Sequence, residues 1–466
     1  MPNFAGVRLF SSLTSNFTKV TSGIVSEVAS NIGPNMRHGP HQGAQKSTNV
    51  KPFAVSSAKL LSSACCIAIL FLLLIVDILD KCIIIQTKCK GNHKMNKIIY
   101  LDYAASSLKP ASVIATESEF MSESYANAGR GICSRAVAVD DMVARTRARV
   151  AEFINAEPNQ VVFTANATDG LNRIVNIISR QPWYAEMSTF AVSDLDHHSA
   201  RMPWQELMYA GKIRKMFVCE LNENFDIKID AIPKTDFLVV TAMSNVLGRA
   251  QDVEKIVATA RSKNPNVVVV VDASQYVVHE KIDVKKWNCD FMVFSGHKIG
   301  ADTGVGILYI RDSEKYFPDK FGGGMVARID ADENWFLAPP PEKWEAGTLP
   351  LTQIAGLVPA IDYLEQHRPN QNLIKYAYDE LSKIARVKIL TTCDAAILSF
   401  VIDGMHPLDV GAIFGAHNIC VRVGNMCASW IHQRLNIPGS VRISIGSDTT
   451  MNEMQQAVTV IKNMVK

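Results

Sequence analysis

Cysteine is scarce in this sequence, with 10 cysteines among 466 residues and no Cys-x-x-Cys pair. Small scaffolds held together by disulfides are several times richer in cysteine. Cys82 and Cys89, like Cys420 and Cys427, are separated by six residues, a spacing that the usual structural zinc sites do not use. We therefore expect reduced thiols and no metal site. Internal repeats and low-complexity segments are absent as well.

Most of the chain also lacks an excess of positive charge. Residues 1–94 carry 10 Lys and Arg against 3 Asp and Glu, whereas residues 95–466 carry 38 against 42. Binding to a nucleic-acid backbone requires a basic surface, so the larger part of the chain is not expected to bind nucleic acid. Its 48% hydrophobic and 20% charged residues are typical of a globular protein. A role with a small molecule fits this composition.

Residues 1–94 differ from the rest and form an extension. They include an uncharged run of 17 residues, 60–76, which is the lower limit for a membrane span. Lysines flank this run on both sides, so the positive-inside rule leaves its orientation open. The first 20 residues are basic and rich in Ser and Thr, which is compatible with an organellar transit peptide. Met95 precedes the first strand-like segment, so an artefact of the gene model is the alternative. Localisation stays open between the cytoplasm, an organelle of the mitochondrial or plastid kind, and a membrane reached through the run.

Strand-like and helix-like segments alternate after residue 98, which predicts an α/β protein. The run of five valines at 267–271 has no polar alternation, as expected for a central strand buried on both faces. We predict a large domain with a mostly parallel sheet over 95–355 and a smaller C-terminal α/β domain over 356–466. The expected strands of the large domain are 98–102, 161–164, 190–192, 237–241, 267–271, 291–294 and 305–310. A helix is expected at 134–155 in the large domain. The C-terminal domain is expected to contain helices at 361–366, 371–385 and 451–465 and strands at 396–402 and 441–445.

Two polar residues follow predicted strands, where ligands of open α/β sheets bind. Lys298 ends the segment SGHK after one strand, and burial there would lower its pKa until the neutral amine can bond to a carbonyl cofactor. Asp272 ends the valine strand, and a carboxylate there can pair with the ring nitrogen of pyridoxal phosphate. Each has a simpler interpretation alone, as a solvated lysine or a helix cap. Together they indicate pyridoxal phosphate.

Three further segments carry residues with suitable chemistry. NATDGLN, residues 166–172, follows a strand and opens a helix, so its amides and the Thr168 hydroxyl can hold a phosphate or serve as an ordinary cap. His197 and His198 lie in DLDHHSARMPW, where an imidazole can stack on an aromatic cofactor and move protons. In VRVGNMCASW, Cys427 lies on a glycine-containing loop suited to a reactive thiolate. Arg442 offers two parallel donors for a substrate carboxylate.

The set of motifs resembles the class V aminotransferases that depend on pyridoxal phosphate, and among these the cysteine desulfurases. The similarity runs from about residue 98 to 465, nearly the whole of the chain after the extension. It is carried, in the order of the family, by IYLDYAASSLKP, NATDGLN, DHHSARMPW, SNVLG, VDASQ, SGHK, FGGG, WEAGT and RVGNMCA. The resemblance implies a type I pyridoxal-phosphate-dependent transferase fold and a homodimer.

The resemblance also implies a role for each matching residue. Lys298 would bind the cofactor covalently, and Cys427 would attack the sulfur of L-cysteine to give L-alanine and a persulfide. The other cofactor contacts would be Asp272 at the pyridine nitrogen, Gln275 at the ring hydroxyl, His197 stacked on the ring, and Thr168, Ser295 and His297 at the phosphate, with Gly347 and Thr348 supplied by a second subunit. Asn245 and Arg442 would hold the substrate carboxylate. The short loop before Cys427 implies a sulfur-accepting partner protein and a role in iron–sulfur cluster or related assembly.

Three positions depart from the family pattern. Ala167 replaces a second threonine, Cys133 replaces a histidine, and the proline that often follows the reactive cysteine is missing from CASW. The alternatives are a selenocysteine lyase or another class V lyase or epimerase, which would not need Cys427, and a non-catalytic scaffold. The intact set of Lys298, Asp272, His197, Cys427 and Arg442 argues against a scaffold.

Overall fold

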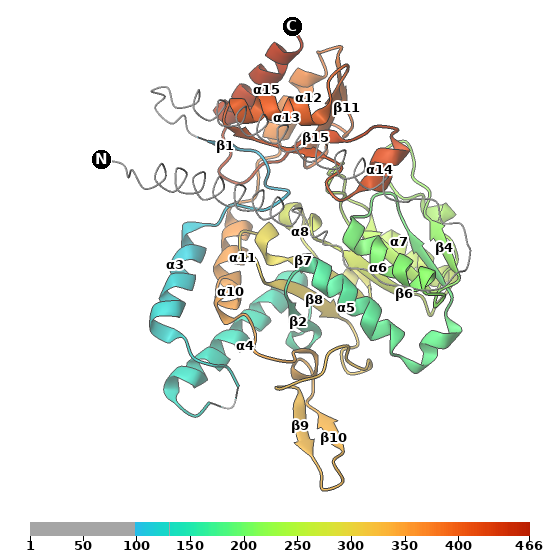
Figure 1. Ribbon diagram of the computed structural model, residues 1–466, viewed down its shortest axis with the longest axis vertical. Coiled ribbons are helices and arrows are strands. Elements are labelled where there is room, and N and C mark those ends of the chain that lie inside the picture. Colours follow the sequence, from blue (N-terminus) through green and yellow to red (C-terminus); the bar gives the residue numbers. More distant parts are fainter. Residues whose placement is uncertain (1–97, 130) are drawn as a thin grey trace, which may run out of the picture. The chain divides into compact units, whose positions relative to one another are not determined.

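The computed structural model in Figure 1 describes residues 98–129 and 131–466 of the chain. The uncharged run at 60–76, the basic N-terminal segment and Met95 lie outside these residues, so their predictions stay untested. Among the described residues, no helix is both long enough and apolar enough to cross a membrane. The chain from residue 94 onward forms one compact unit.

The larger part of this unit is built around a seven-stranded sheet with the strand order β2-β8-β7-β6-β5-β3-β4. Strand β8 runs antiparallel to both of its neighbours, and the other neighbouring pairs are parallel. The mostly parallel sheet expected from the sequence is therefore confirmed. Its strands are β2 (Val161–Thr164), β3 (Thr189–Val192), β4 (Lys215–Val218), β5 (Phe237–Thr241), β6 (Val268–Asp272), β7 (Phe291–Ser295) and β8 (Gly306–Ile310).

Helices cover both faces of this sheet (Figure 1). Val269 and Val271 of β6 pack into one hydrophobic cluster, which includes residues of α4, α7 and α11. Val268 and Val270 face the opposite way into a second cluster with α5 and α6. The valine strand is thus buried on both faces, as its lack of polar alternation predicts. The helices of this part are α3 (Ala111–Glu119), α4 (Ser134–Ile154), α5 (Ala167–Ser179), α6 (His198–Tyr209), α7 (Val253–Lys263), α8 (Tyr276–His279), α9 (Val284–Trp287), α10 (Leu351–Ala355) and α11 (Leu357–Gln366).

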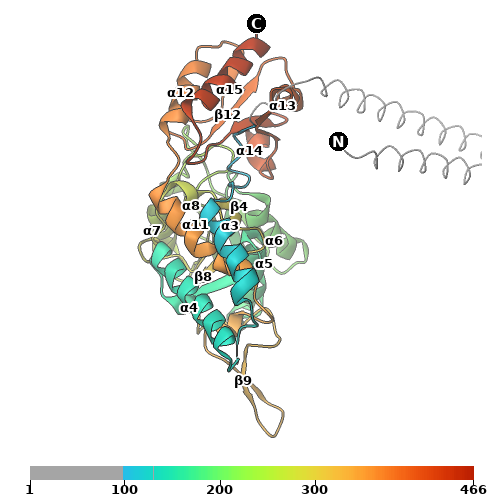
Figure 2. The same cartoon turned by 90° about the vertical axis from the view of Figure 1, so that its left-hand side faces the viewer.

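The C-terminal part contains an antiparallel four-stranded sheet in the order β11-β12-β15-β14. Helices α12 and α15 lie side by side (Figure 2). Helix α15 begins with a capping box in which Thr450 and Glu453 bond to each other's backbone amides, an ordinary start signal. The strands are β11 (Val387–Ile389), β12 (Leu398–Ile402), β14 (Arg422–Gly424) and β15 (Ser440–Ile443), and the helices are α12 (Asn372–Leu381), α13 (Pro407–Ala416), α14 (Ser429–Arg434) and α15 (Met451–Met464).

The hydrophobic clusters divide the chain differently from the predicted boundary at residue 355. Strand β1 (Ile99–Tyr100) pairs in parallel with β13 (Ile419–Cys420), and Ile99 belongs to the C-terminal cluster. In the other direction, α11 packs into the core of the large sheet. The sequence does not reveal this exchange, because a two-residue strand carries no signal for the sheet that it joins. The N-terminal segment therefore crosses from the C-terminal part to the large domain.

A few elements were not expected from the sequence. Edge strand β4 is half-exposed, so it lacks the continuous apolar run that marks the central strands. Strands β9 (Val326–Ile329) and β10 (Trp335–Leu337) pair as an antiparallel hairpin, which projects from the rest of the large domain at the bottom of Figure 1. The short strands β11, β13 and β14 were missed because none exceeds three residues.

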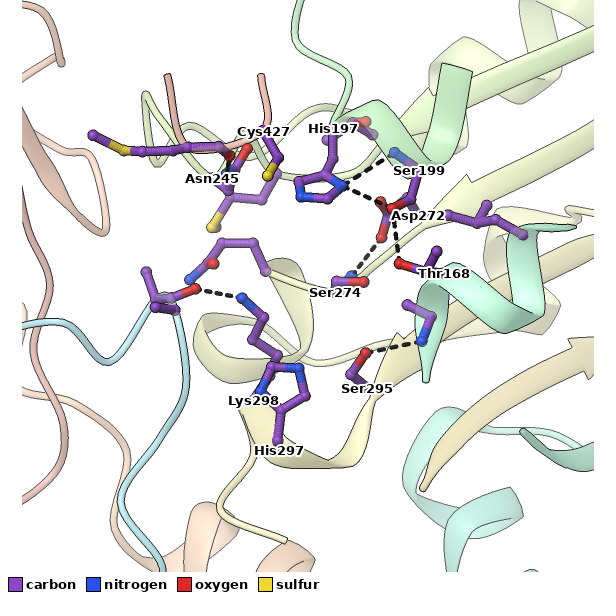
Figure 3. Close-up of a pocket in the computed structure, with 18 of the residues that line it drawn as sticks. Thr168, His197, Ser199, Asn245, Asp272, Ser274, Ser295, His297, Lys298 and Cys427 are labelled. Atoms are coloured by element: carbon purple, nitrogen blue, oxygen red, sulfur yellow. Dashed lines mark hydrogen bonds between the residues drawn. The ribbon is translucent and has the colours of Figure 1, made fainter. Parts of the chain in front are cut away.

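The parallel strands end together at the edge that forms the pocket in Figure 3. In the register of β5 and β6, Thr241 lies opposite Asp272, and both are the last residues of their strands. Ser295 ends β7, the next strand along. Side chains that are far apart in the sequence therefore meet at this edge, as expected for an open α/β sheet.

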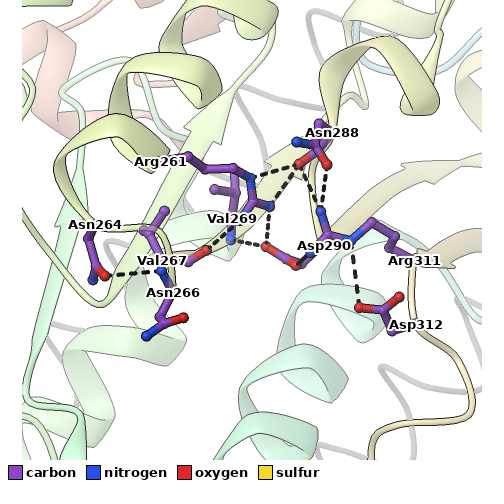
Figure 4. A network of polar contacts seen from close by, with 9 residues as sticks. All are labelled: Arg261, Asn264, Asn266, Val267, Val269, Asn288, Asp290, Arg311 and Asp312. Carbon is purple, nitrogen blue, oxygen red and sulfur yellow. Dashed lines mark hydrogen bonds and ion pairs between the residues drawn. The ribbon is translucent and has the colours of Figure 1, made fainter.

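A buried carboxylate joins several elements next to the start of β7 (Figure 4). Asp290 Oδ2 accepts hydrogen bonds from Val269 N at 2.7 Å and from Arg261 Nη2 at 2.9 Å. Its other oxygen pairs with Arg311. Both guanidinium groups also bond to the Asn288 carbonyl. Asp290 thereby holds α7, β6 and the end of β8 together.

We expect Asp290→Asn to destabilise the fold by about 2–4 kcal/mol, because it leaves two arginines without the buried charge that they share. Urea unfolding of the purified protein measures this effect. The control is Asp312→Asn, because Asp312 is half-exposed and its contact with Arg311 is 3.7 Å long, so its loss should cost less than about 0.5 kcal/mol. Equal unfolding midpoints for the two variants would contradict the assignment.

Candidate active site

The carboxyl edge of the large sheet and the C-terminal part together line a cavity of about 290 Å³. Most residues that the sequence singled out lie in its wall. These are Thr168, His197, Asn245, Asp272, Gln275, Ser295, His297, Lys298, Cys427 and Arg442. Figure 3 shows Cys427 and His197 at one end of the pocket and Lys298 and His297 at the other. The sheet topology therefore brings these residues together as the sequence predicts.

Lys298 follows β7 in the short helical turn Gly296–Lys298. Its ammonium group donates to the carbonyl oxygen of Ala104, on the N-terminal segment. Burial, helped by the nearby charge of Arg442, lowers the pKa of Lys298 to about 8. The opposing charge of Asp272 offsets only part of this effect. A substantial fraction of the amine is consequently neutral near physiological pH, which is the form that reacts with a carbonyl group.

Asp272 and His197 lie near each other in the pocket. The Asp272 carboxylate is 5% exposed and accepts a hydrogen bond from Ser274 N at 3.0 Å. His197 caps α6, and its Nδ1 accepts from Ser199 N at 3.2 Å. Burial lowers the pKa of His197, while the charge of Asp272 acts in the opposite direction. The imidazole is therefore neutral, and its ring is suited to stacking on an aromatic cofactor.

The start of α5 forms a cradle for an anion. Ala167 N donates to Ser295 Oγ at 2.9 Å, and the hydroxyls of Thr168 and Ser199 lie 2.8 Å apart. The positive end of the helix dipole adds to the attraction of a phosphate here. Gly306 lets β8 approach closely, because a Cβ at this position would lie 2.6 Å from Asn166 Cα. The cradle is thus held against the sheet.

Ser199 is a cradle residue that the sequence interpretation missed. The signal was present, since Ser199 stands two residues after His197 in the DHHSARMPW segment. Ala167, which replaces a threonine of the family pattern, has no side-chain hydroxyl. Its backbone amide donates to Ser295 Oγ instead. The hydroxyl of Ser199 beside Thr168 provides a second oxygen from another helix.

His297 lies beside Lys298 in Figure 3. Its Nδ1 lies 3.3 Å from Ser106 Oγ. Burial and the charge of Lys298 lower the pKa of His297 to about 4, so the ring is neutral. His297 lines the pocket, and its role at a phosphate stays a prediction.

Among the described residues that line the pocket, three carry a buried polar atom without a hydrogen-bond partner. The atoms are Asn245 Oδ1, Gln275 Oε1 and Arg442 Nε. Their residues are otherwise fixed: Asn245 Nδ2 donates to Met426 O at 2.9 Å, and Arg442 donates to Asp102 Oδ1 at 3.0 Å. Gln275 Nε2 lies 3.2 Å from a ring nitrogen of His279. Unpartnered buried polar atoms are costly, which indicates that a polar ligand completes this site.

Cys427 lies between β14 and α14 with its side chain exposed to the pocket. Both Met426 and Cys427 have left-handed backbone angles, with φ of +51° and +54°. His198 N donates to Cys427 O at 2.7 Å. The Cys427 thiol therefore lies at the other end of the pocket from the Lys298 amine (Figure 3).

Three residues discussed in the sequence do not reach the pocket of this chain. Gly347 and Thr348 line a separate cavity, together with Gly129 and Asp140. Cys133 is exposed at the start of α4. A contribution of Gly347 and Thr348 to the site therefore requires a second subunit.

The arrangement fits pyridoxal 5′-phosphate, the cofactor that the motifs imply. The amine of Lys298 with its lowered pKa matches the aldehyde, the cradle at α5 matches the phosphate, and the unpartnered oxygen of Gln275 matches a ring hydroxyl donor. A carboxylate at Asp272 matches a protonated ring nitrogen. Each functional group of the cofactor thus has a complementary residue.

Comparisons with known proteins agree with this interpretation. A cysteine desulfurase of Cronobacter sakazakii is 32% identical over 376 residues, covering 78% of this chain and 92% of the relative. The solved structure of a cysteine desulfurase from Thermococcus onnurineus matches with a TM-score of 0.74 and 30% identity, covering 79% of this chain and 94% of that one. A cysteine desulfurase structure from Escherichia coli matches with a TM-score of 0.71 and 28% identity, over 78% and 94% of the two chains.

These matches confirm the predicted type I fold of pyridoxal-phosphate-dependent transferases. The family profile described as aminotransferase class-V matches residues 99–457, nearly all of the part that the structure describes. The order of motifs, the strand-end pocket and the matched length agree, and the chain belongs to the class V aminotransferase family.

Proposed function

We propose that this protein is a cysteine desulfurase, which converts L-cysteine to L-alanine and retains the sulfur on Cys427 as a persulfide. The observation that carries the proposal is that one cavity is lined by both Lys298 and Cys427. Its relatives of known structure and sequence are cysteine desulfurases. The persulfide would supply sulfur for iron–sulfur cluster or related assembly.

Members of the family use pyridoxal 5′-phosphate. When bound, this cofactor supplies an electron-withdrawing ring that stabilises an electron pair on the substrate's α-carbon. In this chain Lys298 would hold it covalently, and Asp272 would keep its ring nitrogen protonated. The hydroxyls of Thr168, Ser199 and Ser295 would bind its phosphate, and the neutral ring of His197 would pack against its face.

Arg442 and Asn245 are suited to bind the carboxylate of cysteine. Arg442 is only 2% exposed and keeps Nε without a partner. Asn245 donates through its side-chain Nδ2 to the cysteine loop, and its backbone carbonyl accepts from Arg442 Nη1 at 2.9 Å. A carboxylate near Arg442 would therefore be oriented relative to Cys427. Lys298 Nζ, with its pKa of about 8, is the base in the wall that can take the α-proton of the substrate.

The thiolate of Cys427 completes the reaction. Its Sγ attacks the substrate sulfur, an S–S bond forms, and the substrate's C–S bond breaks. The electron pair of that bond passes to the substrate carbon, which is later protonated to give alanine. Cys427 thus ends as the persulfide, and no external oxidant or reductant is consumed.

We further propose that the active protein is a homodimer, whose second subunit supplies Gly347 and Thr348 to the site. Large apolar side chains exposed on and next to α3 and α4 support this, because burying apolar side chains favours association. They are Ile114, Met121, Tyr125, Ile132 and Val137. Light scattering of the purified protein tests the dimer. The short loop before Cys427 supports transfer of sulfur to an acceptor protein.

Lys298 gives the first test of this function. The rate at which the cofactor-free protein binds pyridoxal phosphate covalently should rise with pH and level off above about 8, since only the neutral amine reacts. A lysine of ordinary pKa would give rates that rise to about pH 10. Stopped-flow absorbance measures the rate, and borohydride reduction with peptide mass spectrometry identifies the modified lysine. Lys298→Ala should give no adduct, whereas Lys285→Ala, at an exposed lysine, should behave as the parent. A covalent adduct in Lys298→Ala would refute the assignment.

Cys427 gives the second test. Cys427→Ser should bind cofactor and cysteine but release alanine at less than about 1% of the parent rate and carry no persulfide, because a hydroxyl is a poor acceptor of sulfur. Alanine chromatography and mass spectrometry of the protein measure the two outcomes. Cys133→Ser, at an exposed cysteine outside the pocket, is the matched control and should keep its activity. Desulfuration by Cys427→Ser at the parent rate would show that another group accepts the sulfur, and retained selenocysteine cleavage alone would favour a lyase.

The N-terminal extension gives a third test. A chain that begins at Met95 should fold, bind the cofactor and desulfurate cysteine like the full chain, because the pocket wall runs from Ala104 to Arg442. Size-exclusion chromatography, cofactor absorbance and alanine release compare the two proteins. If the shortened chain aggregates while the full chain is active in detergent, residues 1–94 contribute to the fold.

A further inference from the structure

The loop that carries Cys427 has an unusual backbone for residues with side chains. Met426 and Cys427 adopt left-handed angles in succession, and Gly424 has a φ of +95°. Left-handed angles are unfavourable for residues other than glycine, so they persist only where neighbouring groups enforce them. The proline that often follows the reactive cysteine in relatives is absent from CASW. Other contacts must therefore hold the loop.

His198 contacts this loop at two residues, Cys427 and Ser429, which flank Ala428. Its backbone N–H donates to Cys427 O at 2.7 Å. Its ring Nε2 accepts from Ser429 N at 3.2 Å and lies 3.0 Å from Ser429 Oγ. Ser429 is the first residue of α14, where the amide has no partner within the helix. The ring thus caps α14 in the way that a side-chain oxygen usually does.

The ring of His198 is itself fixed by packing. It lies edge-on to Trp430, with ring centroids 5.1 Å apart. The guanidinium of Arg201 lies 4.3 Å from the centre of the Trp430 ring, and Arg201 is 5% exposed and pairs with Asp194 at 3.7 Å. Burial lowers the pKa of His198, so the ring is neutral and Nε2 is free to accept. Rotation of the ring would disrupt the contact with Trp430.

His198 also follows His197 directly, at the start of α6. The two rings diverge, with centroids 6.3 Å apart. The first ring lines the pocket, and the second bonds to the loop after Cys427. His197 and His198, adjacent at the start of α6, therefore connect the pocket wall with the loop that carries the Cys427 thiol.

We propose that His198 is a positioning residue, which caps α14 and fixes the Cys427 loop relative to His197 in place of the missing proline. The catalytic meaning of this inference rests on the proposed desulfurase function. The positioning itself is a property of the loop and is measured without turnover.

The test compares His198→Phe, which keeps an aromatic ring against Trp430 but removes the acceptor, with His198→Gln, whose side-chain oxygen restores an acceptor near Nε2. In the full-length protein with cofactor bound, hydrogen–deuterium exchange of peptides covering 425–430 should quicken about tenfold in the Phe variant, the factor expected for one lost hydrogen bond. Exchange in the Gln variant should stay within about threefold of the parent. The same exchange rate in the Phe variant and the parent would overturn the inference.

Turnover gives the second measurement. The Phe variant should lower kcat for alanine release about tenfold and change KM for cysteine by less than about twofold, because the carboxylate-binding Arg442 is untouched. The Gln variant should recover most of kcat. Equal loss in both variants would show that the ring acts by packing alone and would overturn the role as acceptor. If neither Cys427→Ser nor His198→Phe alters turnover while exchange changes as expected, the proposed function fails and the positioning stands.

His406→Phe is the matched control. His406 Nδ1 accepts from Leu408 N at 3.3 Å at the start of α13, so this variant also removes a histidine cap. It should leave exchange over 425–430 and kcat unchanged. Where His198→Phe loses the cofactor's visible absorbance, His198→Leu decides, because it removes the Nε2 acceptor for Ser429 with a smaller apolar side chain. A rise in loop exchange of about threefold then supports the inference, and an unchanged rate overturns it.

Discussion

The burial of positive charge around one pocket is the constraint on which this structure depends. Lys298 and Arg442 line the same cavity as the exposed Arg422, and desolvated cations are costly unless carboxylates and hydrogen bonds compensate them. Asp102 accepts from Arg442 at 3.0 Å and pairs with Arg422 at 2.7 Å, while Asp272 acts on Lys298 through its charge. Burial and the positive charge of Arg442 lower the pKa of Lys298, and the positive excess that is left favours anionic ligands. A phosphate and a carboxylate are the two anions that a desulfurase must bind.

Besides Asp272 at the end of β6, the compensation is supplied by the N-terminal segment. Asp102 and Ala104 lie directly after β1, which pairs with β13 of the C-terminal part. Lys298 comes from the large domain and Arg442 from the C-terminal sheet. The segment therefore stabilises cations from both parts of the protein. The pairing of β1 with β13 fixes the position of the Asp102 carboxylate and the Ala104 carbonyl. Without this segment, Lys298 of the large domain and Arg442 of the C-terminal sheet would each lose a partner that offsets the cost of burying them.

The sequence predicts the sheet and its edge well, because the signals are local. Asp272 and Lys298 follow uninterrupted apolar runs, and such runs end at the ligand-binding edge of a parallel sheet. The partners of β1 were not predictable, since a two-residue strand has no periodicity. The capping role of His198 was also invisible, because it joins residues 231 positions apart. Ser199 was within reach of the sequence, and the second-subunit role of Gly347 and Thr348 depends on an assembly that one chain does not contain.

The pairing of β1 with β13 has a consequence for biosynthesis. A ribosome delivers the chain from its N-terminus, so residues 99–104 emerge long before the strands around Ile419 and Arg442 that give them their place. Arg442 belongs to the last quarter of the chain, so Lys298 reaches the full surroundings that lower its pKa only after that part has been made. We therefore expect this amine to capture the cofactor aldehyde late in folding.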